Sequence, residues 1–136
     1  MSLNSIYALK DYIGFSKIKH PCRKRNEQTC RKILQHRYYT SVNYVNELFG
    51  PIIQHLKDFD LYDNTIVVLW GEHGWKLFEY NGWYKQSNFN IDIYVPMIIH
   101  CPNQPNAGEQ TFEITELIDM FPTLCDLAGI DKPSYL

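Results

Sequence analysis

The sequence lacks long hydrophobic runs, closely paired cysteines and any excess of positive charge. It has no stretch of about 18 consecutive apolar residues, so it offers no candidate for a membrane-spanning helix. The formal net charge of −2 argues against a general nucleic-acid binder, which normally presents a basic face. None of the four cysteines lies in a CxxC spacing, which argues against a structural zinc site; they are Cys22, Cys30, Cys101 and Cys125.

The composition that remains fits one ordinary domain. The chain has 136 residues, of which 45% are hydrophobic, and this is enough to build a core at that length. Residues 1–26 show no sustained periodicity, so we expect an irregular segment there.

A helical pattern begins near Glu27. Apolar residues recur at steps of three and four, which is typical of an amphipathic helix packed on one side. They are Ile33, Leu34, Tyr38, Val42, Val45, Phe49, Ile52 and Leu56. Gly50-Pro51 interrupts the pattern, and a proline inside a helix removes one backbone hydrogen bond. The sequence therefore predicts a long kinked helix, or two abutting helices, ending near Lys57.

Two apolar runs follow and predict strands. Thr65–Trp70 is short, rich in β-branched residues and almost wholly apolar, which is typical of a strand buried on both faces in a parallel sheet. This prediction places Trp70 in the core. Tyr94–His100 predicts a second strand, with Pro96 at its beginning or at a bulge. Residues 71–90 between them have no period and predict a long loop.

A second helix is predicted near the end of the chain. Thr115 can cap it, its apolar positions have helical spacing, and Gly129 ends it. The order helix, strand, loop, strand, helix indicates an α/β fold with a mostly parallel sheet flanked by helices.

The residues that can carry chemistry gather in the loop after the first predicted strand. Glu72-His73 lies between Gly71 and Gly74, and Lys85 follows further along. Ligands of open α/β sheets bind beyond the carboxyl ends of the strands, and glycines allow close backbone approach. A hard cation needs several oxygen ligands, so Glu72 would supply only part of its shell. The alternative is a surface loop whose tryptophans fold back on the core.

Five segments, in order, match the motifs of one known family. Arg37–Val45 resembles a helix reading Tyr-Tyr-Ala-Ser-Val-Ser-Tyr-Val, and Thr65–Trp75 resembles an apolar strand running into Asp-His-Gly-Trp. Trp83–Phe89 is similar to Trp-x-Lys-x-Ser-Asn-Phe, and Val95–Ile99 to Val-Pro-Leu-Ile. Glu116–Gly129 resembles Glu-Leu-Val-Asp-Leu-Phe-Pro-Thr-Leu-x-x-Leu-Ala-Gly. Together these segments resemble the sulfatase family, closest to its iduronate-2-sulfatase branch.

The resemblance, which spans residues 27–133, implies an alkaline-phosphatase-like fold and hydrolysis of sulfate esters, with glycosaminoglycan as the expected substrate. It implies that Glu72 and His73 help to hold a divalent cation, usually calcium. Lys85 would contact the sulfate ester, where an ammonium offsets charge that builds up in the transition state. Trp75 and Trp83 are candidates for a sugar pocket, although packing is the favoured role for both. The sequence itself leaves the location open, and the resemblance implies a lysosomal, secreted or periplasmic setting.

The sequence also departs from the family pattern. It has no Cys-x-Pro-x-Arg motif, from whose cysteine the family makes its formylglycine nucleophile, and it has no paired aspartates to complete the metal site. Both features lie far upstream in the family, so the resemblance implies a C-terminal part of a catalytic domain that is inactive by itself. Glu72 stands where the family has Asp, and Phe78 and Tyr80 stand where it tends to have Gly and His.

Two other functions remain open on sequence grounds. One is a non-catalytic relic or binding module that keeps the fold, and the other is a phosphoester hydrolase of the same superfamily.

A part of a larger sheet also exposes unpaired strand edges, so we expect the isolated chain to be poorly stable or to self-associate.

Overall fold

The computed structural model describes residues 27–85 and 87–135, and the segment predicted to be irregular lies outside them, with Cys22 and His20. The described residues form two compact units. One contains residues 27–50 and 73–95, and the other contains residues 51–72 and 96–135. No helix in these described parts is long and apolar enough to cross a membrane.

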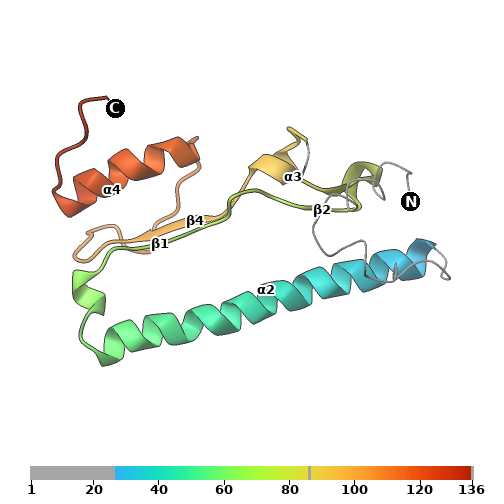
Figure 1. The fold of residues 1–136 in the computed structure, drawn as a ribbon, viewed down its shortest axis with the longest axis horizontal. Helices are drawn as coiled ribbons and strands as arrows, with labels where there is room; N and C mark the ends of the chain where they lie inside the picture. The colour runs from blue at the N-terminus through green and yellow to red at the C-terminus, as the bar shows by residue number, and fades with distance from the viewer. Residues whose placement is uncertain (1–26, 86, 136) are drawn as a thin grey trace. The chain divides into compact units, whose positions relative to one another are not determined.

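The predicted long helix is confirmed as α2, Glu27–Asp58 (Figure 1). It runs as one α-helix through Pro51, so the alternative of two abutting helices is wrong. Proline withholds only its own N–H, and the hydrogen bonds on either side of that position are enough to continue the helix. The helix stops where Asp60 adopts a positive φ of 55° and the Leu61 N–H turns back to the Leu56 carbonyl at 2.8 Å.

The first unit contains regular structure that the sequence did not predict. Residues 71–90, expected to form a loop, include strands β2 (Lys76–Leu77) and β3 (Trp83–Tyr84). The strands pair antiparallel, with Lys76 opposite Tyr84 and Leu77 opposite Trp83. A 3₁₀ turn at Glu79–Asn81 joins them, and the short helix α3 (Asn90–Ile93) follows. Strands of two residues are too short to produce a detectable period.

The core of this unit lies between α2 and the β2–β3 pair. Its buried members are Leu77, Trp83 and Tyr84, with Leu34, Tyr38, Trp75 and Phe78 packed against them. The Gln35 side-chain amide donates to the Leu77 carbonyl at 3.0 Å and so ties α2 to β2. The favoured packing role of both tryptophans is confirmed, since Trp83 is buried and Trp75 stacks on Tyr38.

The second unit contains the two predicted strands, shorter than expected. They are β1 (Val67–Trp70) and β4 (Met97–His100). They pair antiparallel, with Val67 opposite His100 and Trp70 opposite Met97. The α/β character is therefore confirmed, but the expected parallel arrangement is wrong for this pair. An apolar, β-branched run specifies a strand without specifying the direction of its neighbour.

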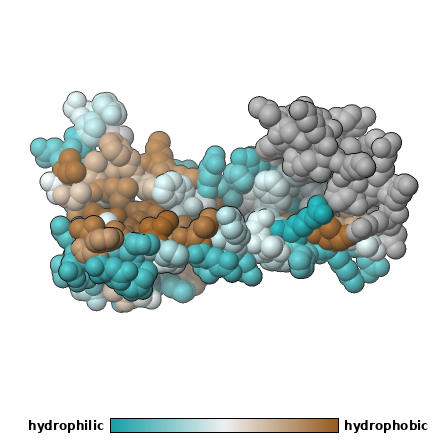
Figure 2. Space-filling view, turned by 60° about the horizontal axis from the view of Figure 1, so that its bottom comes forward, coloured by the Kyte–Doolittle hydropathy of each residue, from teal (hydrophilic) through white to brown (hydrophobic). Residues whose placement is uncertain are grey.

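The expected burial of these strands on both faces is also wrong. Trp70 is 47% exposed, so it is not a core residue, and Ile98 is 59% exposed. The sheet that β1 and β4 form in the described part of the chain has only these two strands. Figure 2 shows hydrophobic surface gathered on the left of the view, where Figure 1 places β1, β4 and α4. Apolar strand residues are exposed because a two-stranded sheet has little to cover them.

The C-terminal helix is confirmed with a different start. A 3₁₀ turn at Leu117–Asp119 leads into α4, Met120–Ala128. The cap is not Thr115: Glu116 precedes the turn, and its N–H donates to the Asp119 carboxylate at 2.9 Å. Gly129 ends α4 with a φ of 66°, as expected of a left-handed cap.

Gly74 provides a stability test for the first unit. A Cβ on Gly74 would lie 1.8 Å from the Ile91 carbonyl oxygen, and the Gly74 N–H donates to the Asp92 carbonyl at 2.8 Å. We expect Gly74→Ala to lower the free energy of unfolding by about 1–3 kcal/mol, because the backbone must shift to admit the methyl group. Urea unfolding followed by circular dichroism measures this change.

Gly50→Ala is the matched control. A Cβ at Gly50, inside α2, meets nothing within 4 Å. This substitution should raise stability by about 0.5–1 kcal/mol, because glycine weakens a helix interior. Equal effects of the two alanines would contradict the close packing of Gly74 against α3.

Candidate functional site

The two residues of the predicted metal site lie in different surroundings. Glu72 ends the 51–72 part of the second unit, with an exposed side chain that makes no hydrogen bond or ion pair to the described residues. His73 begins the 73–95 part of the first unit and is half-buried, with Nδ1 2.8 Å from the Gly74 carbonyl oxygen. A carbonyl can only accept, so this contact places the imidazole proton on Nδ1.

A neutral His73 ring in this tautomer presents a lone pair on Nε2. A histidine whose other ring nitrogen donates to a carbonyl is in the tautomer that binds metal ions. The described residues contain no group of three or more His, Cys, Asp or Glu side chains that could hold a metal ion. His73 and Glu72 thus fit a cation only as part of a larger ligand shell.

Lys85 lies just after strand β3, in a turn that also contains Tyr84 and Ser87; we call this the Lys85 turn. Tyr84 has a positive φ of 72°, which bends the chain away from the strand. The Ser87 N–H donates to the Lys85 carbonyl at 2.8 Å, and the Lys85 side chain is half-buried. The main chain of Lys85 is thus tied to Ser87 by a hydrogen bond.

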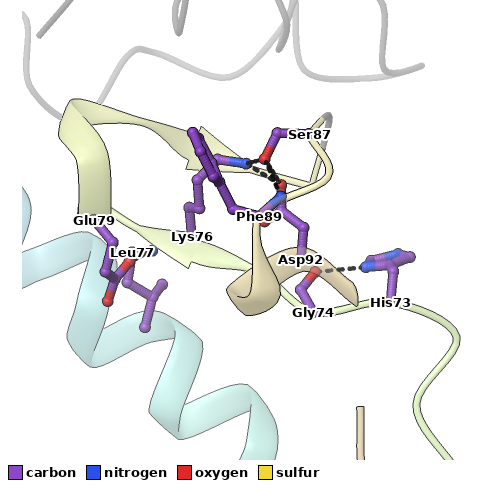
Figure 3. Close-up of polar contacts among 8 residues, drawn as sticks. All are labelled: His73, Gly74, Lys76, Leu77, Glu79, Ser87, Phe89 and Asp92. Carbon is purple, nitrogen blue, oxygen red and sulfur yellow. Dashed lines mark hydrogen bonds and ion pairs between the residues drawn. The ribbon is translucent and has the colours of Figure 1, made fainter. Parts of the chain in front are cut away.

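A buried ion pair lies beside the Lys85 turn (Figure 3). Lys76 and Asp92 are 6% and 3% exposed, and Lys76 Nζ pairs with Asp92 Oδ2. Lys76 Nζ also donates to Ser87 Oγ at 3.0 Å, and Ser87 Oγ donates to Asp92 Oδ2. Sequence reasoning missed this Lys76–Ser87–Asp92 cluster, because no spacing rule links residues that meet only through a turn and a short helix.

The charge state of the cluster excludes one chemistry. Burial by itself raises the pKa of Asp92, but hydrogen bonds from Lys76 and Ser87 and the Lys76 charge hold that pKa below its ordinary value. Asp92 is therefore the anionic partner of Lys76 in this pair. Lys76 donates to Asp92 and to the Ser87 hydroxyl, and that hydroxyl donates to Asp92, so Lys76 is not arranged as the base of a serine–lysine nucleophile.

Phe78 and Tyr80 adopt backbone conformations that L-residues rarely occupy. Phe78 has φ 99° and Tyr80 has φ 52°, on either side of Glu79. The Phe78 ring packs on Trp83. The Arg31 guanidinium carbon lies 3.1 Å from the centroid of the Phe78 ring. Phenylalanine thus stands at a position whose backbone favours glycine, the residue typical of the family there. Tyr80 stacks on Phe89 and remains 72% exposed.

The other aromatic, histidine and cysteine positions pack against neighbouring residues or lie at the surface. Trp75 packs between Tyr38 and Tyr84, so its proposed place in a sugar pocket stays a prediction. His36 and His55 are exposed, and His100 stacks on Tyr62. Cys125 is buried. Cys30 is disulfide-bonded, whereas Cys101 and Cys125 are free thiols.

The lowered pKa of Asp92 predicts how stability depends on pH. A carboxyl whose folded pKa lies below its unfolded value, about 3.9, contributes stability above that value. This contribution is lost as the pH falls through the folded pKa. Asp92→Asn should remove that dependence, and at neutral pH it should cost about 3–5 kcal/mol because the Lys76 charge stays buried and unpaired. Urea unfolding between pH 2 and 7 measures both effects.

Asp126→Asn is the control for this prediction. Asp126 pairs with Lys132 at 2.7 Å, but both side chains are solvent-exposed. Exposed pairs contribute about 0–1 kcal/mol, so this variant should follow the wild-type pH curve closely. The burial argument is wrong if the two asparagine variants show the same curve.

Comparisons with known proteins agree with the resemblance of the motifs. A family model described as "Sulfatase" matches residues 5–130. The chain is 34% identical to human iduronate 2-sulfatase over 127 residues, which covers 76% of this chain. It is 33% identical to human arylsulfatase K over 99 residues, or 73% of this chain.

One solved structure is similar in both sequence and fold. The structure of BT4656 in complex with its substrate D-glucosamine-2-N,6-O-disulfate has a TM-score of 0.64 and 31% sequence identity, and the match covers 68% of this chain and 19% of that one. This chain spans 23% of the length of human iduronate 2-sulfatase and 18% of that of human arylsulfatase K. Because the family model covers most of the sequence, this chain belongs to the sulfatase family.

Proposed function

We propose that this chain forms part of a sulfatase that hydrolyses sulfate esters on sugars, with Lys85 as the residue that contacts the sulfate. The observation that supports this most is the Lys85 turn, which presents a half-buried lysine from a segment fixed by hydrogen bonds. BT4656, the structural neighbour, has a sulfated glucosamine as its substrate, which favours a sulfated sugar here. Iduronate 2-sulfatase-like action on glycosaminoglycan is the finer form of the proposal.

Lys85 suits this role through its charge and its partial burial. Cleavage of a sulfate ester increases the negative charge on the departing oxygen and on the sulfate oxygens. An ammonium fixed beside those oxygens stabilises the transition state more than the ground state, and a half-buried position reduces screening by water.

Glu72 and His73 are the residues of this chain that would hold the divalent cation. A bound cation polarises the sulfate and neutralises its charge. His73 Nε2 has the free lone pair that a ligand needs, and the Glu72 carboxylate is free of other described partners. Calcium is the cation we propose, with further ligands and the formylglycine nucleophile supplied by sequence other than these 136 residues. We therefore expect the isolated chain to be inactive.

A second candidate is a non-catalytic protein that keeps the sulfatase fold. Glu72 is one methylene longer than aspartate, a large change for ligands that must lie about 2.3–2.6 Å from calcium. Phe78 occupies a backbone conformation suited to glycine and fills the space beside it with a packed ring. Both features favour altered or lost chemistry within the family.

Lys85 is tested by activity in the enzyme that carries this chain. We expect Lys85→Ala to lower kcat on an aryl sulfate by about 10²–10³-fold, the typical loss for one electrostatic contact to a developing anion. Steady-state kinetics on 4-nitrophenyl sulfate measure it. Lys132→Ala, which removes an exposed lysine of the second unit, is the control and should leave kcat unchanged. Undiminished activity of Lys85→Ala would remove its assigned role.

Glu72 is tested by calcium binding in the same enzyme. We expect Glu72→Ala to weaken calcium binding by at least about tenfold, because a coordinating carboxylate is lost. Isothermal titration with calcium chloride measures the affinity, and Glu109→Ala, an exposed acid elsewhere in the second unit, is the control. Calcium binding indifferent to Glu72 would remove it from the metal site. A wild-type enzyme that binds no calcium and hydrolyses no sulfate would favour the non-catalytic candidate.

A further inference from the structure

Lys76 contacts the Lys85 turn on both sides of Lys85, at Tyr84 through its main chain and at Ser87 through its side chain. In strand β2 it lies opposite Tyr84, which immediately precedes Lys85. Its ammonium donates to the Ser87 hydroxyl at 3.0 Å, two residues after Lys85. One residue thus fixes the chain on either side of the lysine proposed to meet the sulfate.

Asp92 holds Lys76 and Ser87 together and links them to a third segment. Its Oδ2 accepts a hydrogen bond from each of these two side chains, so both donors meet at one carboxylate oxygen (Figure 3). Its main-chain oxygen accepts from the Gly74 N–H at 2.8 Å, one residue after His73. Through Asp92, the segment after His73 and the Lys85 turn are bound to the same short helix, α3.

The cluster acts through its neighbours because its charged groups are not available to a ligand. Lys76 and Asp92 are almost fully buried and neutralise one another. Asp92 Oδ1 is buried without a hydrogen-bond partner among the described residues. The donors that stabilise the buried carboxylate, Lys76 and Ser87, therefore both act on Oδ2. Neither charged group can therefore bind a sulfate ester directly without breaking the pair.

We propose that Lys76 and Asp92 are positioning residues that hold the Lys85 turn in its sulfate-contacting conformation. This inference rests on the proposed function of Lys85. A lysine side chain on a loose turn loses conformational freedom when it meets its ligand, whereas a fixed turn has already lost part of that freedom. The cluster therefore raises the affinity for sulfate without touching it.

The experiment removes the cluster without leaving a buried charge. Replacing only Lys76 or only Asp92 leaves the other charge buried without a partner, whereas an apolar pair of similar size can keep the fold. The test variant is accordingly the double change Lys76→Met with Asp92→Leu, made in the full enzyme that carries this chain. Lys76→Arg, which keeps the charge and the donors, is the conservative rescue. The matched control is Lys132→Met with Asp126→Leu, which removes the exposed ion pair of the second unit.

Two readouts separate positioning from simple stability. The first is ligand-free: amide hydrogen exchange and ¹⁵N relaxation at Lys85 and Ser87 report how well the turn is ordered. The second is NMR titration of the Lys85 side chain with sodium sulfate, at ionic strength kept constant with sodium chloride. Thermal melting of every variant shows whether the fold survives.

We expect the double variant to melt near the wild type, to exchange the Ser87 amide at least about tenfold faster and to bind sulfate about tenfold more weakly. Lys76→Arg should restore most of both properties, and the Lys132/Asp126 control should match the wild type. An ordered Lys85 turn in a folded double variant overturns the proposal, as does unchanged sulfate affinity.

Failure of the proposed function gives a different result. A wild-type enzyme in which sulfate does not shift Lys85 counts against sulfate contact by Lys85. A turn that still loosens in the double variant then supports the positioning role by itself. Should the double variant fail to melt cooperatively, Ser87→Ala, which removes only the link from the cluster to the turn, provides the same comparison.

Discussion

The buried pair of Lys76 and Asp92 is the interaction on which the arrangement of the first unit depends. Two charges at almost full burial are costly unless each satisfies the other, and here Ser87 completes the set. The pair connects strand β2, the turn after β3 and helix α3, three segments too short to be stable alone. Helix α2 supplies the apolar side of the same unit through Leu34 and Tyr38.

Close backbone approach is the second constraint on the site. Gly74 lies against the Ile91 carbonyl with no room for a side chain, and this contact places the His73 segment on α3. Phe78 shows the opposite case, since a bulky residue occupies a conformation with φ 99°. Its ring packs on Trp83 and beneath Arg31, and these contacts offset strain that a glycine would not have. The turn thus has a conformation suited to glycine, the residue that the family resemblance places there.

The sequence predicted those features that depend on long periodic patterns or motifs. The helix from Glu27 and the helix ending at Gly129 have several turns of spaced apolar residues, and both are confirmed. The strands near Trp70 and Ile98 were located but given the wrong relative direction and too much burial, because direction and covering layers depend on residues distant in sequence. The family assignment was confirmed because it used several motifs in order.

The Lys76–Ser87–Asp92 cluster could not be predicted in the same way. Lys76 and Asp92 are 16 residues apart and meet only because a short hairpin and a single helical turn fold back on one another. A lysine after a tryptophan, and an aspartate in an apolar stretch, read as ordinary surface residues in a sequence. The burial that turns them into an ion pair is a tertiary property.

The two parts of the proposed site differ in how firmly the described residues hold them. Lys85 lies in a turn fixed by a strand pair, a main-chain hydrogen bond and a buried ion pair. Glu72 is exposed and bound to no other described residue, and only the His73 imidazole is oriented, by one carbonyl. As a ligand of the proposed cation, Glu72 would take its geometry from the cation and from the ligands beside it. The described residues thus give no support that compensates for the longer carboxylate of Glu72, whereas a change at the buried Lys76 must keep its charge or remove Asp92 with it.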